Sequence, residues 1–387
     1  MPSLDIATVR SAFPALSSGF LYADNAGGSQ CLADAVTRIS DYLLNTNVQL
    51  GADYVVSQKS TSRVASGAEA AKELFNADSV GEIAFGSSAT MLVANLARAM
   101  EKDVQEGDEV IITGEHEANV GPWKRLAARR GAIIKLWLPS QIAASPNNPY
   151  AVSLQLEDLL PLITAKTRLI AFTACSNILG SVVPVKEIVH AAREKARKFG
   201  APKFEVAVDC VAYAPHRRID VKDWDIDYCV FSVYKVYGPH ASALYVRASA
   251  LTSSLSSLAH HFLSVDAKPY KLQPGGPGYE IVYGCTAEQG GEGVQIVGDE
   301  HEGLSRVPTV SFVVAGERPI RSKDVVKAFD EKGDIGIRYG HFYAYTLVDT
   351  LQPKLDVDDA VVRISFVHYN TVQEVETIIR VLDEVLA

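Results

Sequence analysis

One lysine of this chain stands where its amine could react with a carbonyl compound. Lys235 follows an apolar run at 230–234 that is typical of a buried strand. Burial disfavours the ammonium form of a lysine, and a neutral amine can form an imine with an aldehyde or a ketone. The alternative is a lysine that only extends from a strand end into water. The residues that accompany Lys235 in the fold must decide between the two.

An aspartate in a similar position is the first such companion. Asp209 ends a second apolar stretch, Phe204 to Val208, upstream of Lys235. Alone, it could be a helix cap or a structural hydrogen-bond acceptor. Pyridoxal phosphate, however, needs both groups: a lysine that holds it as an imine, and a carboxylate that keeps its ring nitrogen protonated so that the ring accepts electrons. The pair therefore predicts pyridoxal phosphate as the cofactor.

A phosphate group also needs donors, and the segment 81–90 can supply them. A short strand there runs into small residues, and a helix is expected over 91–100. The backbone N–H groups of Ser88, Ala89 and Thr90 and the positive end of the helix dipole would face an anion. These residues could equally form an ordinary helix cap. Ser232, near Lys235, could add a hydroxyl to the same phosphate.

Seven sequence blocks match, in the same order, the blocks of a known enzyme family. They lie at 21–28, 86–90, 115–123, 176–180, 208–209, 231–239 and 363–365. Over nearly its whole length the chain resembles the class V aminotransferases, in their cysteine desulfurase-like group. The resemblance implies an α/β fold, that of the fold type I pyridoxal-phosphate-dependent transferases. Such enzymes have a large domain with a mostly parallel seven-stranded sheet and a smaller α+β C-terminal domain.

The resemblance also implies roles for single residues. His116 would stack on the cofactor ring, and Asn177 would donate a hydrogen bond to its phenolic oxygen. Asp209 would pair with the ring nitrogen, and Lys235 would be the residue that holds the cofactor and does the catalysis. Without the resemblance, His116 would be taken for a histidine of the core or the surface.

Three residues are expected to contact the substrate. Arg363 would bind the substrate carboxylate, since the two parallel N–H groups of a guanidinium match the geometry of a carboxylate. Ala26 and Gly27 of the first block would lie beside it. A surface ion pair is the alternative role for Arg363.

One departure from the family pattern bears on the reaction. Cysteine desulfurases carry a cysteine that accepts sulfur on a loop corresponding to 336–344, and the position of that cysteine is Tyr343 here. A phenol cannot accept sulfane sulfur. No cysteine of this chain lies in that loop, although Cys285, in a stretch expected to be flexible, keeps a sulfur-accepting role open.

Two further departures concern the cofactor. Ala212 stands where the family has a glutamine or a histidine that contacts the phenolic oxygen. Gly276 stands where the family has a threonine that contacts the phosphate of the neighbouring subunit. Both changes put in question how tightly the cofactor is held, and neither removes the pair of Lys235 and Asp209.

Composition agrees with an ordinary soluble enzyme, and the resemblance implies a small amino acid as its substrate. The chain has 387 residues, of which 48% are hydrophobic, and a net charge of −9, with no long basic run. We therefore expect no nucleic-acid partner and no membrane association. Five cysteines without C-x-x-C spacing indicate a reducing compartment and no metal site, and the first residues do not resemble a signal peptide. A cytoplasmic location is expected.

Strand-like and helix-like segments alternate along the chain, which indicates a mostly parallel sheet covered by helices. Strands are expected at 109–113, 132–137 and 168–173, and again near the C-terminus at 309–314 and 360–367. A long loop is expected at 266–280, and a capping box at 371–374 begins the last helix. Its stripe of Val375, Ile378, Ile379, Leu382 and Val385 is expected to lie in the core.

This pattern predicts a large domain at 20–262, and a small domain formed by 263–387 together with 1–19. The resemblance further implies a homodimer that shares its active sites.

The predicted activity is that of a pyridoxal-phosphate-dependent carbon–sulfur β-lyase. It would cleave S-substituted L-cysteines or cysteine sulfoxides to pyruvate, ammonia and a sulfur product, without a cysteine of the enzyme. Alternatives are a cysteine desulfurase or selenocysteine lyase, an epimerase, an aminotransferase and a decarboxylative aldolase. Removal of the Cα proton is common to these reactions, and the shape of the pocket decides the outcome after that step.

Overall fold

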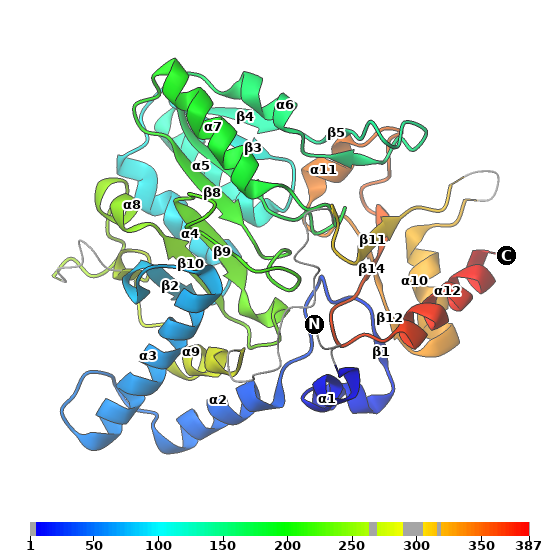
Figure 1. Ribbon diagram of the computed structural model, residues 1–387, viewed down its shortest axis with the longest axis horizontal. Helices are drawn as coiled ribbons and strands as arrows, with labels where there is room; N and C mark the ends of the chain where they lie inside the picture. The colour runs from blue at the N-terminus through cyan, green and yellow to red at the C-terminus, as the bar shows by residue number, and fades with distance from the viewer. Residues whose placement is uncertain (1–4, 263–268, 289–304, 316–318, 387) are drawn as a thin grey trace.

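A seven-stranded sheet forms the centre of the larger part of the molecule (Figure 1). The structure is a computed structural model that describes residues 5–262, 269–288, 305–315 and 319–386. In order across the sheet the strands are β2 (Ile83–Gly86), β10 (Ser242–Val246), β9 (Tyr228–Ser232), β8 (Glu205–Asp209), β7 (Thr167–Thr173), β3 (Glu109–Thr113) and β4 (Ile133–Trp137). Only β10 runs antiparallel to its neighbours. The predicted α/β class and the mostly parallel sheet are confirmed.

The strands form where the sequence has continuous runs of apolar residues. Every residue of β3, β7, β8, β9 and β10 is buried, as expected for a sheet that helices cover on both faces. The strands predicted at 109–113, 132–137 and 168–173 are β3, β4 and β7, to within one residue at either end.

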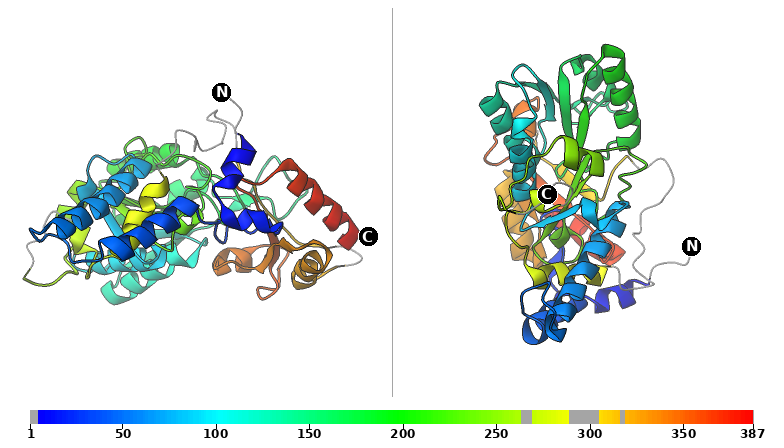
Figure 2. Two further views of the ribbon diagram at one scale, coloured as in Figure 1. Left: turned by 90° about the horizontal axis from the view of Figure 1, so that it is seen from below. Right: turned by 90° about the vertical axis from the view of Figure 1, so that its left-hand side faces the viewer.

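Helices pack on both faces of this sheet (Figures 1 and 2). One face is covered by α3 (Val55–Phe75) and α7 (Val185–Phe199), and the other by α4 (Ala89–Ala99) and α5 (Gly121–Arg130). Neighbouring residues of β9 enter different cores: Phe231 packs with Phe75 of α3, and Val230 packs with Leu92 of α4. The two apolar layers exclude water from both sides of the strands that lead to the site.

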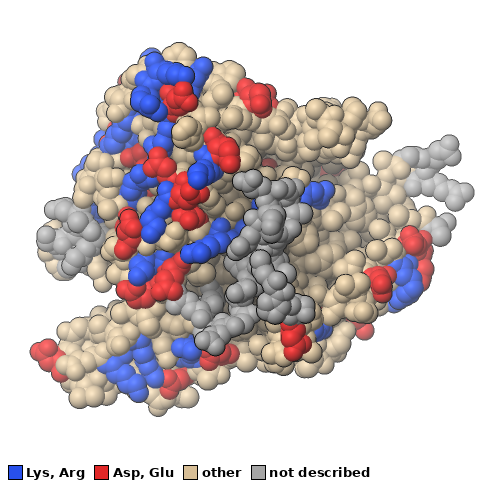
Figure 3. Space-filling model, viewed as in Figure 1, with Lys and Arg blue, Asp and Glu red and all other residues tan. Residues whose placement is uncertain are grey.

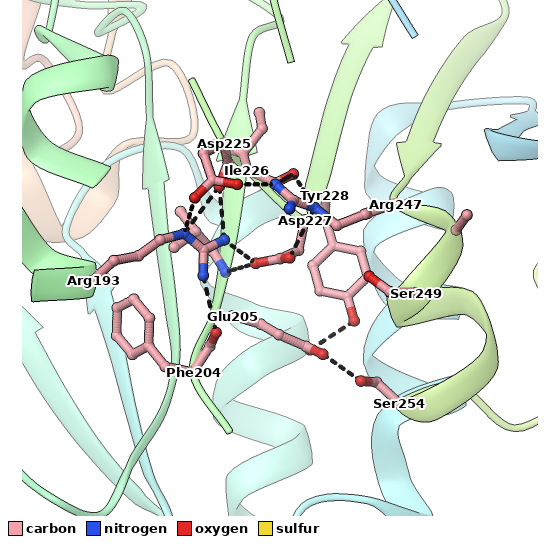
Figure 4. Close-up of polar contacts among 12 residues, drawn as sticks. Arg193, Phe204, Glu205, Asp225, Ile226, Asp227, Tyr228, Arg247, Ser249 and Ser254 are labelled. Carbon is pink, nitrogen blue, oxygen red and sulfur yellow. Dashed lines mark hydrogen bonds and ion pairs between the residues drawn. The ribbon is translucent and has the colours of Figure 1, made fainter. Parts of the chain in front are cut away.

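A polar network holds the opposite, amino-terminal ends of β8 and β9 (Figure 4). Arg193 of α7 and Arg247, which follows β10, both pair with the buried carboxylate of Asp227, at 2.7 and 3.2 Å. Glu205, the first residue of β8, accepts a 2.7 Å hydrogen bond from the hydroxyl of Tyr228, the first residue of β9. Since buried charges are stable only when paired, this network sets how β8 and β9 lie relative to each other.

The smaller part of the molecule is α+β, as predicted. Its three-stranded antiparallel sheet consists of β11 (Thr309–Phe312), β14 (Val361–Ser365) and β13 (Arg338–Gly340), with β14 in the middle. Helices α10 (Ser322–Gly333) and α12 (Val372–Leu386) share a core with it. The N-terminal β1 (Leu21–Tyr22) pairs in parallel with β12 (Ile335–Gly336). The strands predicted near the C-terminus are β11 and β14.

The last helix begins at the predicted capping box, but the face that it turns to the core differs slightly from the predicted one. Thr371 and Glu374 form the capping box: the N–H of Thr371 donates to Oε2 of Glu374, and the N–H of Glu374 donates to Oγ1 of Thr371. The predicted apolar stripe is wrong at one position, because Ile379 is 53% exposed while Val381 is buried. The helix turns a different edge of its apolar face to the core, so Ile379 lies at the border with water.

The other α-helices and strands of the described residues lie within or beside these two parts. They are α1 (Ile6–Ser11), α2 (Ala33–Asn45), β5 (Ser140–Gln141), β6 (Val152–Ser153), α6 (Leu156–Leu159), α8 (Ala248–Ser253), α9 (Tyr279–Gly284) and α11 (Tyr345–Thr350). The division of the chain at residues 262 and 263 stays a prediction. Contacts cross it, since α9 packs against α2 and α3, and Leu272 lies in the core of the large sheet.

The loop predicted at 266–280 lies partly outside the described residues. Where it is described, it contains a short turn of helix at Pro269–Lys271 and the start of α9.

Charged side chains of both signs alternate on the face of the molecule shown in Figure 3, mostly over the large sheet domain. In the described ranges of the chain, every helix is too short or too polar to cross a bilayer. The same ranges hold no group of three or more His, Cys, Asp or Glu residues arranged to bind a metal ion.

Candidate active site

The predicted site residues come together at the carboxyl-terminal edge of the large sheet. Lys235 follows β9, Asp209 ends β8, Asn177 follows β7, His116 follows β3, and Ser88 follows β2. Parallel strands end at one edge, so turns that are far apart in sequence meet there. The small domain adds Arg363 from its central strand β14.

Lys235 lies in a single helical turn, Val233–Lys235, directly after β9. Its side chain is buried, and burial together with the charge of Arg363 lowers the pKa of the amine to about 8, although Asp209 and Asp24 raise it. At pH 7 about a tenth of the amine is therefore neutral, far more than in an ordinary lysine, and the neutral amine is the form that bonds with a carbonyl group.

Asp209 is the last residue of β8, and it is buried as well. Its Oδ1 accepts a 2.9 Å hydrogen bond from the backbone N–H of Val211, which orients the carboxylate. Burial raises the pKa of Asp209, while the charge of Lys235 lowers it. A protonated ring nitrogen beside this carboxylate would supply the positive partner that a buried anion needs.

The turn between β2 and α4 has the geometry of an anion site. Ser88 is the N-cap of α4, and its hydroxyl accepts a 3.1 Å hydrogen bond from the N–H of Met91. The N–H groups of Ala89 and Thr90 are among those that the first turn of a helix leaves without an intrahelical acceptor. The cap and the anion site are compatible interpretations of this turn.

Ser242 connects this turn to the lysine strand. As the first residue of β10, it pairs in register with Gly86 of β2 and with Ser232 of β9. The hydroxyl groups of Ser232 and Ser242 are 3.0 Å apart, and both residues are buried. The antiparallel strand thus places Ser232 next to the turn of Ser88. Contact between Ser232 and a phosphate stays a prediction.

His116 and Tyr343 face each other across the site. Their ring centroids are 5.4 Å apart. Burial, with the charges of Lys235 and Arg363, lowers the pKa of His116 to about 4, so the ring is neutral at physiological pH. Its Nδ1 accepts the N–H of Ala118. A neutral ring with fixed orientation is suited to stacking on a cofactor ring.

The loop that carries Tyr343 is held by its backbone. Phe342 and Tyr343 both have positive φ angles, 48° and 63°, which are uncommon for residues other than glycine. The carbonyl of Phe342 accepts a 2.9 Å hydrogen bond from Nδ2 of Asn177, and the carbonyl of Tyr343 accepts one from the N–H of Glu117. These contacts hold the strained loop against the large domain, with the Tyr343 side chain 65% exposed.

Asn177 therefore has a structural contact beyond the role predicted for it. Its side-chain amide supports Phe342, and its backbone carbonyl accepts a 3.2 Å hydrogen bond from Nη1 of Arg363. Donation to a phenolic oxygen of a cofactor stays a prediction.

Arg363 is almost completely buried, with 2% of its side chain exposed. Its Nη2 pairs with Oδ1 of Asp24 at 2.6 Å, and its guanidinium carbon lies 3.8 Å from the ring centroid of Phe342. Its Nε is one of two buried side-chain nitrogen or oxygen atoms without a hydrogen-bond partner among the described residues. An unpaired buried donor is costly, so this atom indicates where a ligand would bind.

Ala26 and Gly27 lie beside the end of β14, near Arg363. The backbone N–H of Ala26 donates to Oγ of Ser365 at 2.8 Å. A Cβ atom at Gly27 would lie 2.7 Å from Oδ2 of Asp24, so only glycine leaves Asp24 its position. The structure brings both residues to the predicted substrate end of the site; their contact with substrate stays a prediction.

Together these groups fit pyridoxal phosphate. A buried amine with a lowered pKa, a buried carboxylate on the neighbouring strand, a helix N-terminus and a neutral imidazole match its aldehyde, ring nitrogen, phosphate and ring face. The unpaired Nε of Arg363 adds a hydrogen-bond donor for a substrate carboxylate at the same edge.

Glu115 is a residue whose part in the site the sequence did not reveal. It is fully buried next to His116, and its Oε2 accepts a 2.8 Å hydrogen bond from the hydroxyl of Ser176. Burial, and to a lesser degree the charge of Asp209, raises the pKa of Glu115 to about 7. Two buried carboxyl groups thus share one end of the site.

Asp24 and Arg338 are two further residues without a predicted role. Asp24 pairs with both Arg363 and Arg338. Asp24 lies in the matching block 21–28, and Arg338 lies in the loop 336–344 that corresponds to the cysteine-bearing loop of the desulfurases. The signal that could have found Asp24 is the requirement of a buried arginine for a negative partner.

The two departures that concern the cofactor lie in different places. Ala212 packs against the core of the large sheet, near the turn after Asp209. Gly276 is exposed in the segment before α9. Neither residue takes part in the contacts described above. Cys285 is buried at the end of α9, and Cys31 is half-buried.

The fold and these groups define a pyridoxal-phosphate-binding enzyme of the fold type I class. The model of the family described as aminotransferase class-V matches residues 21–287 and 290–378. The chain therefore belongs to the class V aminotransferase family, and pyridoxal phosphate is the cofactor of its site.

The chain is similar to several known proteins, among them these three. It is 41% identical to the aminotransferase-like protein FGM3 of Gibberella zeae, over 99% of both chains. It is 29% identical to the cysteine desulfurase-like protein ustD of Aspergillus flavus, over 99% of this chain and 91% of the other. The crystal structure of the cysteine desulfurase CsdA from Escherichia coli has the same fold, with a TM-score of 0.78, 24% identity and 99% coverage of both chains.

The lowered pKa of Lys235 predicts how its reactivity depends on pH. In cofactor-free protein, covalent attachment of pyridoxal phosphate should quicken with a midpoint near pH 8, because only the neutral amine attacks the aldehyde. The rate is followed by absorbance, and the modified residue by mass spectrometry after borohydride reduction. Lys235→Ala should lose the attachment, whereas the exposed Lys59→Ala should keep it. A midpoint above pH 10 would contradict the prediction.

Glu115 predicts a pH dependence of stability. Its folded-state pKa of about 7 lies above the ordinary value of 4.5, so its stabilising contribution is complete below pH 4.5 and is lost as the pH rises through 7. Relative to Glu115→Gln, the wild-type free energy of unfolding should fall by on the order of 3 kcal/mol across this window.

Urea unfolding of cofactor-free protein at several pH values measures this difference between wild type and variant. Glu117→Gln, a change of an exposed glutamate on the same segment, serves as the control and should leave the wild-type pH dependence intact. Parallel curves for wild type and Glu115→Gln would show that the Glu115 carboxyl is not a neutral buried acid.

Proposed function

We propose that this protein is a pyridoxal-phosphate-dependent carbon–sulfur β-lyase. Its substrates would be S-substituted L-cysteines or their sulfoxides, and its products pyruvate, ammonia and a sulfur compound. The family membership supports an enzyme of this cofactor class, and the place of Tyr343 supports the reaction. A cytoplasmic location belongs to the same proposal.

The observation that carries the proposal is the side chain opposite His116. An enzyme that takes sulfur from cysteine as a persulfide needs a thiol at that point, and the loop presents a phenol. Four of the five cysteines, Cys175, Cys210, Cys229 and Cys285, are buried, and Cys31 is half-buried. Burial raises the pKa of Cys175, which keeps its thiol protonated and unreactive. These positions support a reaction in which sulfur leaves with the product.

The residues of this chain hold the substrate and the cofactor in separate ways. When bound, pyridoxal phosphate supplies an electron sink for the bonds at the substrate's α-carbon. Arg363 binds the α-carboxylate through its free Nε, and Asn177 and Asp24 hold the guanidinium in place. Asp209 would hold a proton on the ring nitrogen of the bound cofactor.

Lys235 moves the proton of the reaction. With substrate in the site, its amine would lie free at the edge of the sheet, and the pKa of about 8 would make it a base of suitable strength to take the Cα proton. The electron pair left by that proton expels the sulfur substituent from the β-carbon as a thiolate or sulfenate. Hydrolysis of the three-carbon product then gives pyruvate and ammonia.

The products distinguish this activity from its alternatives. Purified protein with S-methyl-L-cysteine sulfoxide should release pyruvate and ammonia in equal amounts. L-cysteine giving alanine and sulfane sulfur would instead identify a desulfurase, and L-aspartate giving carbon dioxide would identify the decarboxylative alternative.

A variant of Arg363 in the same assay tests whether this residue binds the substrate. Arg363→Lys should raise KM for the sulfoxide by about tenfold or more, because a lysine cannot place a donor where the unpaired Nε lies and also keep the contacts that Nη1 and Nη2 make. Arg380→Lys on the exposed face of α12 is the matched control, and its KM should equal that of the wild type. An unchanged KM in Arg363→Lys would remove Arg363 from the substrate site.

We further propose that the protein forms a homodimer through α2 and α3. Large apolar side chains are exposed where these two helices are joined: Leu43, Leu44, Tyr54, Val55 and Val56, with Leu44 81% and Val55 78% exposed. The helices extend from the body of the molecule at this end (Figure 1). An exposed apolar cluster of this kind is typical of a protein interface.

The dimer predicts an effect of charge on this surface. The double variant Leu44→Asp, Val55→Asp should be monomeric in size-exclusion chromatography with light scattering, because the new carboxylates would be buried without partners. Ile379→Asp on α12, another exposed apolar residue, should leave the mass unchanged. A wild-type protein with the mass of one chain would refute the proposed dimer.

A further inference from the structure

Two arginines of the small domain share one aspartate at the substrate end of the site. Arg363 and Arg338 are opposite each other in register on β14 and β13. Nη2 of Arg363 lies 2.6 Å from Oδ1 of Asp24, and Nη1 of Arg338 lies 3.4 Å from Oδ2 of the same carboxylate. Asp24 comes from the N-terminal segment, so the group joins residues more than three hundred positions apart.

The surroundings keep these three side chains together. The ring of Phe342 lies near both guanidiniums, 3.8 Å from the central carbon of Arg363 and 5.4 Å from that of Arg338. Gly27 leaves room for the contact, because a Cβ atom there would lie 2.7 Å from Asp24 Oδ2 and 3.0 Å from Arg338 Nη1. The surrounding residues therefore hold the three side chains in this arrangement, unlike a chance ion pair on the surface.

The free donors of this group point to a carboxylate ligand. Arg363 has given Nη2 to Asp24 and Nη1 to the carbonyl of Asn177, and its buried Nε has no partner among the described residues. Arg338 is 52% exposed, and its contact with Asp24 is long for an ion pair. An incoming carboxylate passes the exposed Arg338 and reaches the buried Nε of Arg363.

The net charge of this group determines how many carboxylates of a ligand it can neutralise. Arg363 and Arg338 carry two positive charges and Asp24 one negative charge, which leaves a single positive charge. The neutral ring of His116 adds none, since its pKa is about 4. Asp209 is committed to the ring nitrogen of the cofactor, and Lys235 is uncharged when it acts as the base, so neither changes this count. One carboxylate neutralises this end of the site, and a second would be in excess.

We propose that Asp24 is a specificity-determining residue that selects amino acids with a single carboxylate and disfavours those with a second carboxylate on the side chain. This inference rests on the proposed role of Arg363 in binding the substrate carboxylate, and it does not depend on which bond is cleaved afterwards. It names the charge class of the substrate: a neutral side chain such as a thioether or a sulfoxide.

L-asparagine and L-aspartate test this directly, because they have nearly the same shape and differ by one charge. Binding of each to the holoenzyme is titrated through the change in absorbance of the bound cofactor, which reports occupancy without product formation. The wild type should bind asparagine more tightly than aspartate. Asp24→Asn should shift the ratio of the two dissociation constants by about tenfold towards aspartate, the effect of one charge at close range in a partly buried site.

Two companion variants make the result specific. Arg338→Gln removes the outer positive charge and should shift the same ratio in the opposite direction, towards asparagine. Asp330→Asn removes an exposed carboxylate from α10 of the same domain, and its ratio should equal that of the wild type. If Asp24→Asn fails to fold or to bind the cofactor, the direction of the Arg338→Gln shift decides.

A wild-type preference for aspartate, or a ratio that neither Asp24→Asn nor Arg338→Gln changes, would overturn the inference. Its failure is separable from failure of the proposed reaction. Pyruvate from a sulfoxide with an unchanged ratio would leave the lyase and remove the role of Asp24. The expected shifts without pyruvate would leave the selectivity and remove the lyase.

Discussion

Exclusion of water from Lys235 is the constraint on which the rest of the site depends. A lysine at a sheet edge would ordinarily be charged and solvated. Here helices cover both faces of the strands, and burial lowers the pKa of the amine to about 8. The two apolar layers that stabilise the fold are thus also what makes the amine reactive. A change that let water reach β9 would affect stability and chemistry together.

That constraint creates a second one, because several charged groups must be buried around the lysine. Asp209, Arg363 and Glu115 are each buried within the same edge of the molecule. Arg363 is stabilised by Asp24, Asp209 by a backbone N–H and the nearby cation, and Glu115 by a hydroxyl and a proton of its own. The carboxyl groups of Asp24, Asp209 and Glu115 balance the charges of Arg363 and Lys235 only if Glu115 keeps its proton, as its raised pKa indicates. The site is therefore an electrostatic unit in which few residues can be changed singly.

How well each part could be predicted from sequence depends on the range of the interactions. Continuous apolar runs made β3, β7, β8 and β9 predictable, and residues at their ends were placed at one edge because parallel strands end together. The roles of Asp24 and Arg338 were not predicted, because they depend on contacts between the N-terminal segment and β13 and β14. Ile379 was misplaced because an apolar stripe on a helix fixes its inner face only to within about one residue.

The loop that carries Tyr343 bears on the proposed reaction, because its backbone conformation does not depend on that side chain. Its conformation is held by hydrogen bonds to the backbone carbonyls of Phe342 and Tyr343, from Asn177 and from the N–H of Glu117. Neither bond involves the side chain of Tyr343, which is mostly exposed and faces the ring of His116. A thiol or a phenol can therefore occupy this position on the same backbone, and the choice decides whether the protein itself can accept sulfur. The cofactor residues lie on other segments, so this choice is made independently of the groups that activate the substrate.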